Sequence, residues 1–283
     1  MPAVAPVDPQ RLAALLGPGT WWTRLESVEV TGSTNDDVVA RAEAGEPAGL
    51  ARFAAHQTGG RGRHARTWVD VPGACLAVSV LVRPARPRPT WGWVPLLAGA
   101  GLAGALTSLW PHAAGRIALK WPNDVLVDGA KVSGILAQAT ADAVVIGVGV
   151  NVALEAGELP LPTATSLRLA FMTEHRPDVP VSGTAGGPGP EDSSGGRETD
   201  MTKLAAAVLS HLQERLAAWE AGEDVRTGYE ASCATIGRPV RVLVGPDQAV
   251  EGVATGVDDG GSLVVATREG ERVFSAGDVV HLR

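Results

Sequence analysis

The run of strand-like segments between residues 116 and 152 constrains the fold more than any other feature of the sequence. In "RIALKWPNDVLVDGAKVSGILAQAT", residues 116–140, the pair Asp128-Gly129 stands between two apolar runs, a pattern that predicts a β-hairpin with a type I′ turn. The almost wholly apolar "DAVVIGVGVNV", residues 142–152, predicts a further strand directly after it. Adjacent strands with helices set apart indicate an α+β class rather than a doubly wound sheet.

Three more strands are predicted upstream. They are "RLESVEV" at 24–30, "GLARFAAHQ" at 49–57 and "ACLAVSVLV" at 74–82. Between the first two, "GSTNDDVVARAEAG" predicts a helix that is capped by Ser33 or Thr34 and ends at Gly45. Further helices are predicted at 94–110, at 201–222 and from 224.

The helix at 94–110 contains "GAGLAG", which matches GxGxxG, and no P-loop motif is present in the sequence. No strand leads into this motif, so close helix packing explains the glycines better than a dinucleotide site. The segment is also short for a membrane span and rich in glycine and alanine, which favours a buried core helix.

The tail from Gly237 consists of short strands broken by glycine turns and predicts a small β-barrel domain. We therefore divide the chain into residues 1–235 and 236–283. Residues 174–200 are rich in proline, glycine and serine, which predicts an insertion without regular structure.

The composition excludes several classes of protein. A net charge of -7 argues against a broad nucleic-acid-binding face. Cys75 and Cys233 lie far apart and without metal-site spacing, so neither a zinc site nor a disulfide framework is indicated. The N-terminal residues lack a signal-peptide pattern, and we expect a cytoplasmic protein.

The segment "HQTGGRGRHARTW", residues 56–68, combines glycines with Arg61, Arg63 and Arg66. Glycine permits close approach of a backbone to a ligand, and arginine matches carboxylates and phosphates, so the segment predicts an anion clamp. A solvated loop and an RNA-binding segment are the alternatives. Only three of the 24 basic residues are lysines, and two of these, Lys120 and Lys131, lie close together, which indicates positions that need a compact ammonium group.

Polar residues also gather at the ends of the predicted strands. Taken singly, each has an ordinary explanation as a cap, a turn residue or a solvated side chain. Their common position at strand ends predicts one shared site. The set comprises Ser33, Thr34, Asn35, Gln57, Lys120, Asn123, Asp124, Lys131 and Asn151.

The motifs "GSTN", "GRGRHARTW", "KWPNDV" and "KVSGIL" occur in an order and spacing that resemble the biotin-protein ligases. The resemblance extends from about Thr31 to the C-terminal domain. It implies a catalytic domain similar to class II aminoacyl-tRNA synthetases, followed by a small SH3-like β-barrel. It also implies two half-reactions: biotin and MgATP give biotinyl-adenylate, and the biotinyl group then passes to a lysine of a biotin carboxyl carrier domain.

The resemblance assigns roles to the shared site. Arg63 and Arg66, on a glycine-rich loop that closes over the adenylate, would hold the biotin carboxylate and the α-phosphate together with Lys131. Ser33, Thr34 and Gln57 would bind the ureido ring. The implied biotin site comprises Ser33, Thr34, Asn35, Gln57, Gly60, Arg61, Arg63, Lys131, Gly134 and Gly149. The implied adenylate site comprises Arg63, Arg66, Trp68, Lys120, Asn123, Lys131 and Asn151, and the catalytic set is Lys131, Arg63, Arg66 and Asp124.

Some questions stay open in the sequence. Three roles are open for Asp124: it binds magnesium, it is the base that deprotonates the acceptor lysine, or it only stabilises a turn. The rival functions are a lipoate-protein ligase, a non-catalytic biotin-binding protein and an RNA-binding protein. Only about thirty residues precede "GSTN", so we expect no DNA-binding domain and no DNA partner, and we expect a monomer or a weak homodimer.

Overall fold

The computed structural model describes residues 6–172, 199–245 and 248–282. The predicted insertion at 174–200 lies outside the described residues, apart from Thr199 and Asp200. Asp200 is the N-cap of the following helix, where its side chain accepts hydrogen bonds from the backbone N–H groups of Thr202 and Lys203.

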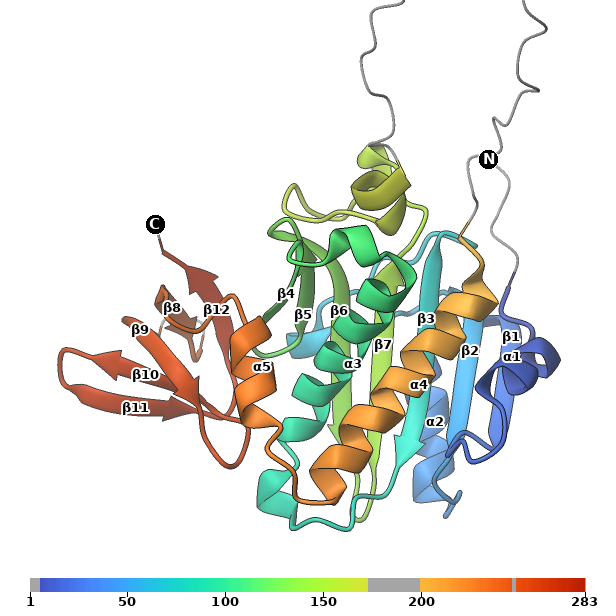
Figure 1. Ribbon diagram of the computed structural model, residues 1–283, viewed down its shortest axis with the longest axis horizontal. Helices are drawn as coiled ribbons and strands as arrows, with labels where there is room; N and C mark the ends of the chain where they lie inside the picture. Colours follow the sequence, from blue (N-terminus) through green and yellow to red (C-terminus); the bar gives the residue numbers. More distant parts are fainter. Residues whose placement is uncertain (1–5, 173–198, 246–247, 283) are drawn as a thin grey trace, which may run out of the picture.

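A seven-stranded sheet forms the centre of the larger part of the molecule, in the order β1-β2-β3-β7-β6-β5-β4 (Figure 1). Only the β1–β2 pair is parallel. The strands are β1 Arg24–Thr31, β2 Leu50–Gln57, β3 Cys75–Val82, β4 Ile117–Lys120, β5 Asp124–Val127, β6 Ala130–Ala139 and β7 Val144–Asn151.

The strand and turn predictions for this sheet are confirmed, except that the first arm of the predicted hairpin is divided into β4 and β5, which pair antiparallel. β5 and β6 form the expected hairpin, and Asp128 and Gly129 both have positive φ, at 50° and 78°. A type I′ turn needs positive φ at both central residues, which aspartate tolerates and glycine adopts freely. The α+β prediction is therefore correct, because every strand pair of this sheet other than β1–β2 is antiparallel.

Five α-helices are described, and α2 is the one that links the parallel strands β1 and β2. The helix at the N-terminus was not predicted; Asp8 caps it and Pro9 occupies its first turn. The helices are α1 Pro9–Leu16, α2 Thr34–Glu43, α3 Trp93–Leu109, α4 Met201–Glu220 and α5 Arg226–Ser232. The single-turn 3₁₀ segments are Arg63–Ala65, Arg88–Thr90, Pro111–Ala113 and Ala156–Glu158, and Arg168–Met172 is a π-helical turn.

Alternation along the strands separates two cores. On β7, Val144, Ile146, Val148 and Val150 pack into the larger core with α3 and α4, which cover one face of the sheet (Figure 1). Val145 faces the other way, into a smaller core with α2. The site described below lies on this second, less covered face.

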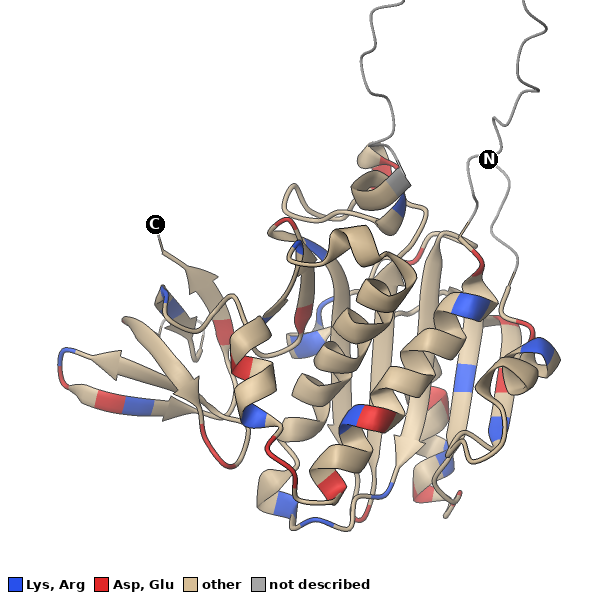
Figure 2. Cartoon of the chain, viewed as in Figure 1, with Lys and Arg blue, Asp and Glu red and all other residues tan. Residues whose placement is uncertain are grey.

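Helix α3 is a buried core helix, as predicted, and Figure 2 shows it without a charged residue. A Cβ added at Gly101 would come within 2.9 Å of the Leu212 backbone, so the small residues allow α3 and α4 to pack closely. Close packing thus accounts for the GxGxxG match. Among the described residues, no helix combines the length and hydropathy that crossing a membrane requires.

The C-terminal strands form a separate five-stranded antiparallel sheet, in the order β11-β10-β9-β8-β12. They are β8 Pro239–Leu243, β9 Ala249–Val257, β10 Leu263–Thr267, β11 Gly270–Phe274 and β12 Asp278–His281. This sheet is consistent with the predicted SH3-like domain but is open, since β11 and β12 lie at opposite edges and do not pair in the described residues. Instead the sheet packs against the larger part of the molecule: Trp121 Nε1 donates to Gly261 O at 3.1 Å, and Trp93 Nε1 donates to Asp259 O at 3.0 Å.

Candidate active site

Small side chains make a hollow on the second face of the large sheet. Gly149 of β7 pairs with Ala77 on one side and Gly134 on the other, and Gly147 pairs with Ser79 and Leu136. The glycines of "VVIGVGVN" face this hollow, while the alternating valines face the α3 side. Glycine in the middle of a strand costs packing and conformational entropy, and its presence indicates that something approaches the backbone here.

A cavity of about 520 Å³ opens over this hollow. Its walls come from the start of α2, the loop between β2 and β3, strands β3 to β7, the loop after β7, and strands β8 and β12. Every predicted site residue except Gly60 lines it. They are Ser33, Thr34, Asn35, Gln57, Arg61, Arg63, Arg66, Trp68, Lys120, Asn123, Asp124, Lys131, Gly134, Gly149 and Asn151. The sequence therefore identified one site, and its size is typical of a small-molecule pocket.

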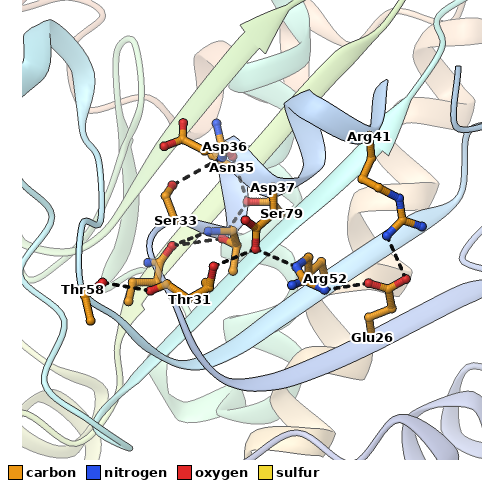
Figure 3. Close-up of polar contacts among 12 residues, drawn as sticks. Glu26, Thr31, Ser33, Asn35, Asp36, Asp37, Arg41, Arg52, Thr58 and Ser79 are labelled. Carbon is orange, nitrogen blue, oxygen red and sulfur yellow. Dashed lines mark hydrogen bonds and ion pairs between the residues drawn. The ribbon is translucent and has the colours of Figure 1, made fainter. Parts of the chain in front are cut away.

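Helix α2 is fixed so that its first residues form one wall of the cavity. Asp37 accepts hydrogen bonds from Thr31 Oγ1 and from Arg52 Nε, both at 2.8 Å (Figure 3). Arg52 also pairs with Glu26, which ties α2 to β1 and β2. Ser33 caps the helix by accepting from the Asp36 N–H, as predicted, at 3.4 Å.

Neutral polar side chains cover the floor of the cavity near α2. Gln57 Oε1 accepts from the backbone N–H of Thr34 at 2.9 Å and lies 3.1 Å from Thr34 Oγ1. Ser79 contacts both Thr34 Oγ1 and Asn35 Oδ1 at 2.8 Å. Thr34, Asn35 and Ser79 are at most 4% exposed, so this floor is a buried network with little freedom to move.

Lys131 reaches the cavity because β6 carries a bulge. The partners of the adjacent β5 residues Val125 and Leu126 are Ser133 and Lys131, which leaves Val132 as an extra residue. The extra residue resets the alternation, so Lys131 and Gly134 both line the cavity although they are three positions apart. Lys131 Nζ lies 2.6 Å from the Asp124 carboxylate.

The arginine loop between β2 and β3 folds back as a narrow hairpin. Arg61 bridges to Thr67, Trp68 N donates to Gly60 O at 2.9 Å, and Gly62 N donates to Arg66 O at 2.7 Å. At its base, Gln57 N donates to the Asp70 carboxylate at 2.7 Å. Burial raises the pKa of Asp70 above its ordinary value.

The three arginines of this loop have different surroundings. Arg61 pairs with Asp36 at 2.9 Å, and Arg66 pairs with Asp278 of β12. Arg63 has no ion pair within 4.0 Å among the described residues, and its guanidinium contacts Asn123 Oδ1 at 3.3 Å. Burial lowers the pKa of Arg63, but arginine stays charged at neutral pH. A largely buried cation without a carboxylate partner is suited to binding an anion.

Trp68 lies over Gly134 and Gly149, the two strand glycines of the biotin site that the resemblance implies. A Cβ at Gly149 would fall 2.6 Å from the indole, and one at Gly134 would fall 3.1 Å from it. Gly60 does not line the cavity, and a Cβ there would meet Trp68 O at 2.8 Å. In this structure, therefore, all three glycines make room for Trp68.

Three buried polar atoms in the cavity wall have no hydrogen-bond partner among the described residues: Trp68 Nε1, Asn151 Oδ1 and Asp124 Oδ1, and the last of these is ion-paired with Lys131. Asn151 Nδ2 donates to Thr165 O at 2.9 Å, which leaves its oxygen for another group. Buried polar groups are seldom left unpaired, so these atoms indicate that a ligand completes the site.

Several lining residues were missed by sequence reasoning. Gly147 and Ser79 could have been found from strand alternation in the sequence, because each is two positions from another cavity-facing residue on its strand. Asp278 carries no such signal, because it belongs to the other sheet and reaches the cavity only through packing of the two sheets. Leu161, Leu243 and Val280 also line the mouth and are exposed.

The described residues hold no cluster of three or more His, Cys, Asp or Glu side chains that would bind a metal ion. Asp124, which is paired with Lys131, offers a carboxylate, and Asn151 Oδ1 offers an additional oxygen. Such a donor set fits Mg²⁺ that arrives bound to phosphates rather than a resident metal.

The arrangement combines a neutral hydrogen-bonding floor with a cationic rim. The floor suits a small polar ring, and Arg63, Arg66 and Lys131 suit carboxylate and phosphate groups. Bringing two anions together is the problem that such a rim solves, because fixed cations offset their repulsion and stabilise the charge that develops in acyl or phosphoryl transfer.

Comparisons with known proteins agree with this arrangement. The model of the Biotin/lipoate A/B protein ligase family matches residues 27–151, and that of the Biotin protein ligase C terminal domain matches residues 235–282. The biotin--[acetyl-CoA-carboxylase] ligase of Mycobacterium tuberculosis is 38% identical over 282 residues, which cover 98% of this chain and 97% of the relative. The ligase of the same name from Paracoccus denitrificans is 31% identical over 80% of this chain and 88% of its own.

Among solved structures, the biotin protein ligase from Aquifex aeolicus in complex with biotin and ATP has the same fold. The TM-score is 0.70 at 24% identity, over 92% of this chain and 99% of that chain. This likeness includes the C-terminal sheet, so the predicted SH3-like domain is present as an open sheet.

Proposed function

The chain belongs to the biotin protein ligase family, and from this premise we propose that it attaches biotin, through biotinyl-adenylate, to a lysine of a biotin carboxyl carrier domain. It is an ATP-dependent ligase. The observation that carries the proposal is the meeting of a neutral polar floor and the cations Arg63, Arg66 and Lys131 in one cavity. A ureido ring, a carboxylate and a nucleotide need these two kinds of surface.

In the first half-reaction, a biotin carboxylate oxygen bonds to the α-phosphorus of MgATP, and the bond to the β-phosphate breaks with loss of pyrophosphate. We assign Arg63 and Lys131 to the carboxylate and α-phosphate, because both line the cavity and Arg63 has no carboxylate within 4.0 Å among the described residues. Arg66 lies at the rim, where it would contact phosphate after leaving Asp278. Mg²⁺ is part of the nucleotide substrate in this scheme.

In the second half-reaction, the carrier lysine attacks the acyl carbon of the mixed anhydride and AMP leaves. The attacking amine must be neutral, so a base has to take its proton. We propose Asp124 for this role, since its carboxylate lies in the cavity beside Lys131. Once Lys131 turns toward the phosphate, Asp124 is free to accept the proton.

For the nucleotide we propose the side of the cavity formed by Lys120, Asn123, Trp68 and Asn151. The unpaired Nε1 of Trp68 and Oδ1 of Asn151 support this assignment, because both need a partner. Closure of the arginine loop would exclude water from the adenylate.

We propose the carrier domains of acyl-CoA or pyruvate carboxylases as acceptors, and a monomer or weak homodimer as the working form. A cytoplasmic location is supported by Cys75 and Cys233, which are both buried and form no disulfide. The proposed boundary between the catalytic and C-terminal domains, after residue 235, falls between α5 and β8.

The test is to incubate the purified protein with ATP, Mg²⁺, biotin and a carboxyl carrier domain, and to read the mass of the carrier. We expect the mass of one added biotinyl group, lost with Lys131→Ala and retained with the matched control Lys203→Ala, which lies on α4. Attachment of lipoate in place of biotin would move the chain to the lipoate branch of its family. Biotin binding without any transfer would indicate a non-catalytic binding protein.

A further inference from the structure

Four oxygen atoms form a chain of short contacts across the floor of the cavity. Asn35 Oδ1 lies 2.8 Å from Ser79 Oγ, Ser79 Oγ lies 2.8 Å from Thr34 Oγ1, and Thr34 Oγ1 lies 3.1 Å from Gln57 Oε1. Figure 3 shows Asn35 and Ser79 in this network between α2 and the sheet. Each contact of this length needs one hydrogen between its two oxygens.

The two ends of the chain are fixed as acceptors. At one end, the Asn35 amide nitrogen faces the backbone carbonyl of Leu136 at 3.4 Å and also donates to Gln138 Oε1. Because a carbonyl oxygen cannot donate, the amide must present its nitrogen there and its oxygen to Ser79. A Cβ at Gly147 would come within 2.4 Å of this oxygen, so the glycine leaves room for this placement.

At the other end, the backbone N–H of Thr34 points at the Gln57 amide at 2.9 Å. A backbone N–H only donates, so the atom it meets must be the amide oxygen of Gln57. Neither end of the chain therefore supplies a hydrogen to it.

The hydrogens can now be counted. The two hydroxyl groups of Ser79 and Thr34 supply two hydrogens, one each, for three oxygen–oxygen contacts. The count alone allows any one of the three contacts to lack a hydrogen, but two oxygens without a hydrogen between them repel most where they are closest. The two 2.8 Å contacts therefore keep the hydrogens, so Ser79 donates to Asn35 Oδ1 and Thr34 donates to Ser79. The contact left without a hydrogen is that between Thr34 Oγ1 and Gln57 Oε1, which is also the longest of the three.

We infer that Ser79 is a specificity-determining residue: by drawing the Thr34 hydrogen to itself, it leaves Thr34 Oγ1 and Gln57 Oε1 as acceptors that need a donor from the ligand. All three residues belong to the cavity wall, but Ser79 is fully buried, so the ligand meets Thr34 and Gln57 rather than Ser79 itself. The inference rests on the proposed function, in which a ring N–H of biotin supplies the missing hydrogen. A ligand with a hydrogen-bond acceptor in place of that N–H would bring a third oxygen lone pair against Thr34 Oγ1 and Gln57 Oε1, and none of the three would have a hydrogen to share.

Ser79 acts through the hydrogen bonds of its hydroxyl group rather than through the volume of its side chain. It is fully buried, and both of its hydrogen bonds are to side chains of the floor. Without the hydroxyl, Thr34 would give its hydrogen to Gln57, and the requirement for a ligand donor would weaken.

The experiment compares two ligands on three proteins. The ligands are biotin and the cyclic carbamate analogues in which one ring N–H is replaced by oxygen, which keeps the shape of the ring. The dissociation constants are measured by calorimetry for the wild type, Ser79→Ala and the control Ser133→Ala. Ser133 is an equally buried serine on β6, but its hydroxyl donates to the backbone carbonyl of Gly149.

We expect the wild type to bind one carbamate isomer about 30-fold more weakly than biotin, and Ser79→Ala to reduce that ratio to about 3-fold, as expected for loss of one buried unpaired contact. Ser133→Ala should keep the wild-type ratio. Ser79→Cys, which retains the volume and a weak donor, should give an intermediate ratio and serves if the alanine variant does not fold.

Desthiobiotin keeps both ring N–H groups, so its affinity relative to biotin should be the same in wild type and Ser79→Ala. An unchanged carbamate ratio in both Ser79 variants, with carrier biotinylation intact, would overturn the inference and leave the proposed function standing. Absence of biotin binding by the wild type would overturn both.

Discussion

The floor and the rim of the cavity differ in how their polar groups are held. On the floor, Thr34, Asn35 and Ser79 are almost fully buried and bonded mainly to one another and to backbone groups. On the rim, the Arg66 side chain is 66% exposed and pairs with an acidic side chain of the other sheet. A buried network keeps one arrangement, whereas an exposed ion pair is weak and exchangeable.

This difference indicates a division of work. The floor is organised before the ligand arrives and selects it by its hydrogen-bond pattern. The rim holds its cations on Asp36, Asp124 and Asp278 until anionic substrates replace these carboxylates. Arg63 is the exception, because it is largely buried and has no carboxylate partner within 4.0 Å in the described residues.

Replacing Arg63 should have the largest effect, because its charge is already directed into the site. Arg63→Ala should slow adenylate formation about 100-fold, the loss typical of removing one group that stabilises developing charge. The measurement is pyrophosphate release in single-turnover conditions. Arg215→Ala, on the exposed side of α4, is the control, and an equal loss there would show that the effect is not local.

Asp124→Asn should separate the two half-reactions. The change keeps the size of the side chain and removes the base, so transfer to the carrier should fall about 30-fold while adenylate formation changes by less than about 3-fold. Both steps are followed with preformed biotinyl-adenylate and with ATP plus biotin. Asp128→Asn in the neighbouring turn, where aspartate pairs with Arg116, is the control. Equal loss of both steps would favour a structural or metal-binding role.

Gly149→Ala tests the boundary between floor and rim, where Trp68 lies. The new Cβ would fall 2.6 Å from the indole and force it away, so we expect affinity for biotin and ATP to fall about 10-fold. Gly157→Ala is the matched control, since a Cβ there meets nothing within 4 Å. Full affinity in Gly149→Ala would show that Trp68 does not need its present position.

Asp278→Asn tests whether the rim ion pair restrains the loop. Releasing Arg66 and His64 should change the KM for ATP by only about 3-fold, because exposed pairs contribute little, and the effect should vanish in high salt. Asp259→Asn removes another ion pair of the C-terminal sheet and should leave KM unchanged. A change of more than tenfold would mean that Asp278 contacts substrate.

Asp70→Asn should have the smallest effect, and on stability rather than activity. Burial raises the pKa of Asp70, so its contribution to stability is complete below the unfolded pKa of about 4 and is lost as pH rises through the folded value. The facing titratable groups are His56 and Cys75, and burial raises the pKa of the Cys75 thiol to about 12, so it stays neutral.

Asparagine keeps the acceptor for the Gln57 N–H without the buried charge. We therefore expect Asp70→Asn to raise Tm by about 2 °C at neutral pH and to match the wild type near pH 3. Asp142→Asn, an exposed partner of Arg83, should show no such pH-dependent gain. A lower Tm at neutral pH would mean that the charge itself stabilises the base of the loop.

Much of the fold was predictable, because local rules decide it. The turn at Asp128-Gly129, the cap at Ser33 and the alternation of β7 each depend on a few neighbouring residues. The features that were not predicted are long-range: the open form of the C-terminal sheet depends on which strand edges meet, and α1 depends on packing against α4 more than on its own short sequence.

The sequence by itself determined the kind of chemistry: a glycine-rich arginine loop, scarce lysines and polar strand ends specify an anion-binding site beside a sheet. The tertiary structure alone decided which groups share it. The bulge at Val132 turns Lys131 toward the cavity, and packing of the two sheets brings Asp278 to Arg66. The shortage of hydrogens on the floor likewise follows only from the contacts among Asn35, Ser79, Thr34 and Gln57. The residue type determines which hydrogens a side chain can donate, but the tertiary structure determines which group it faces.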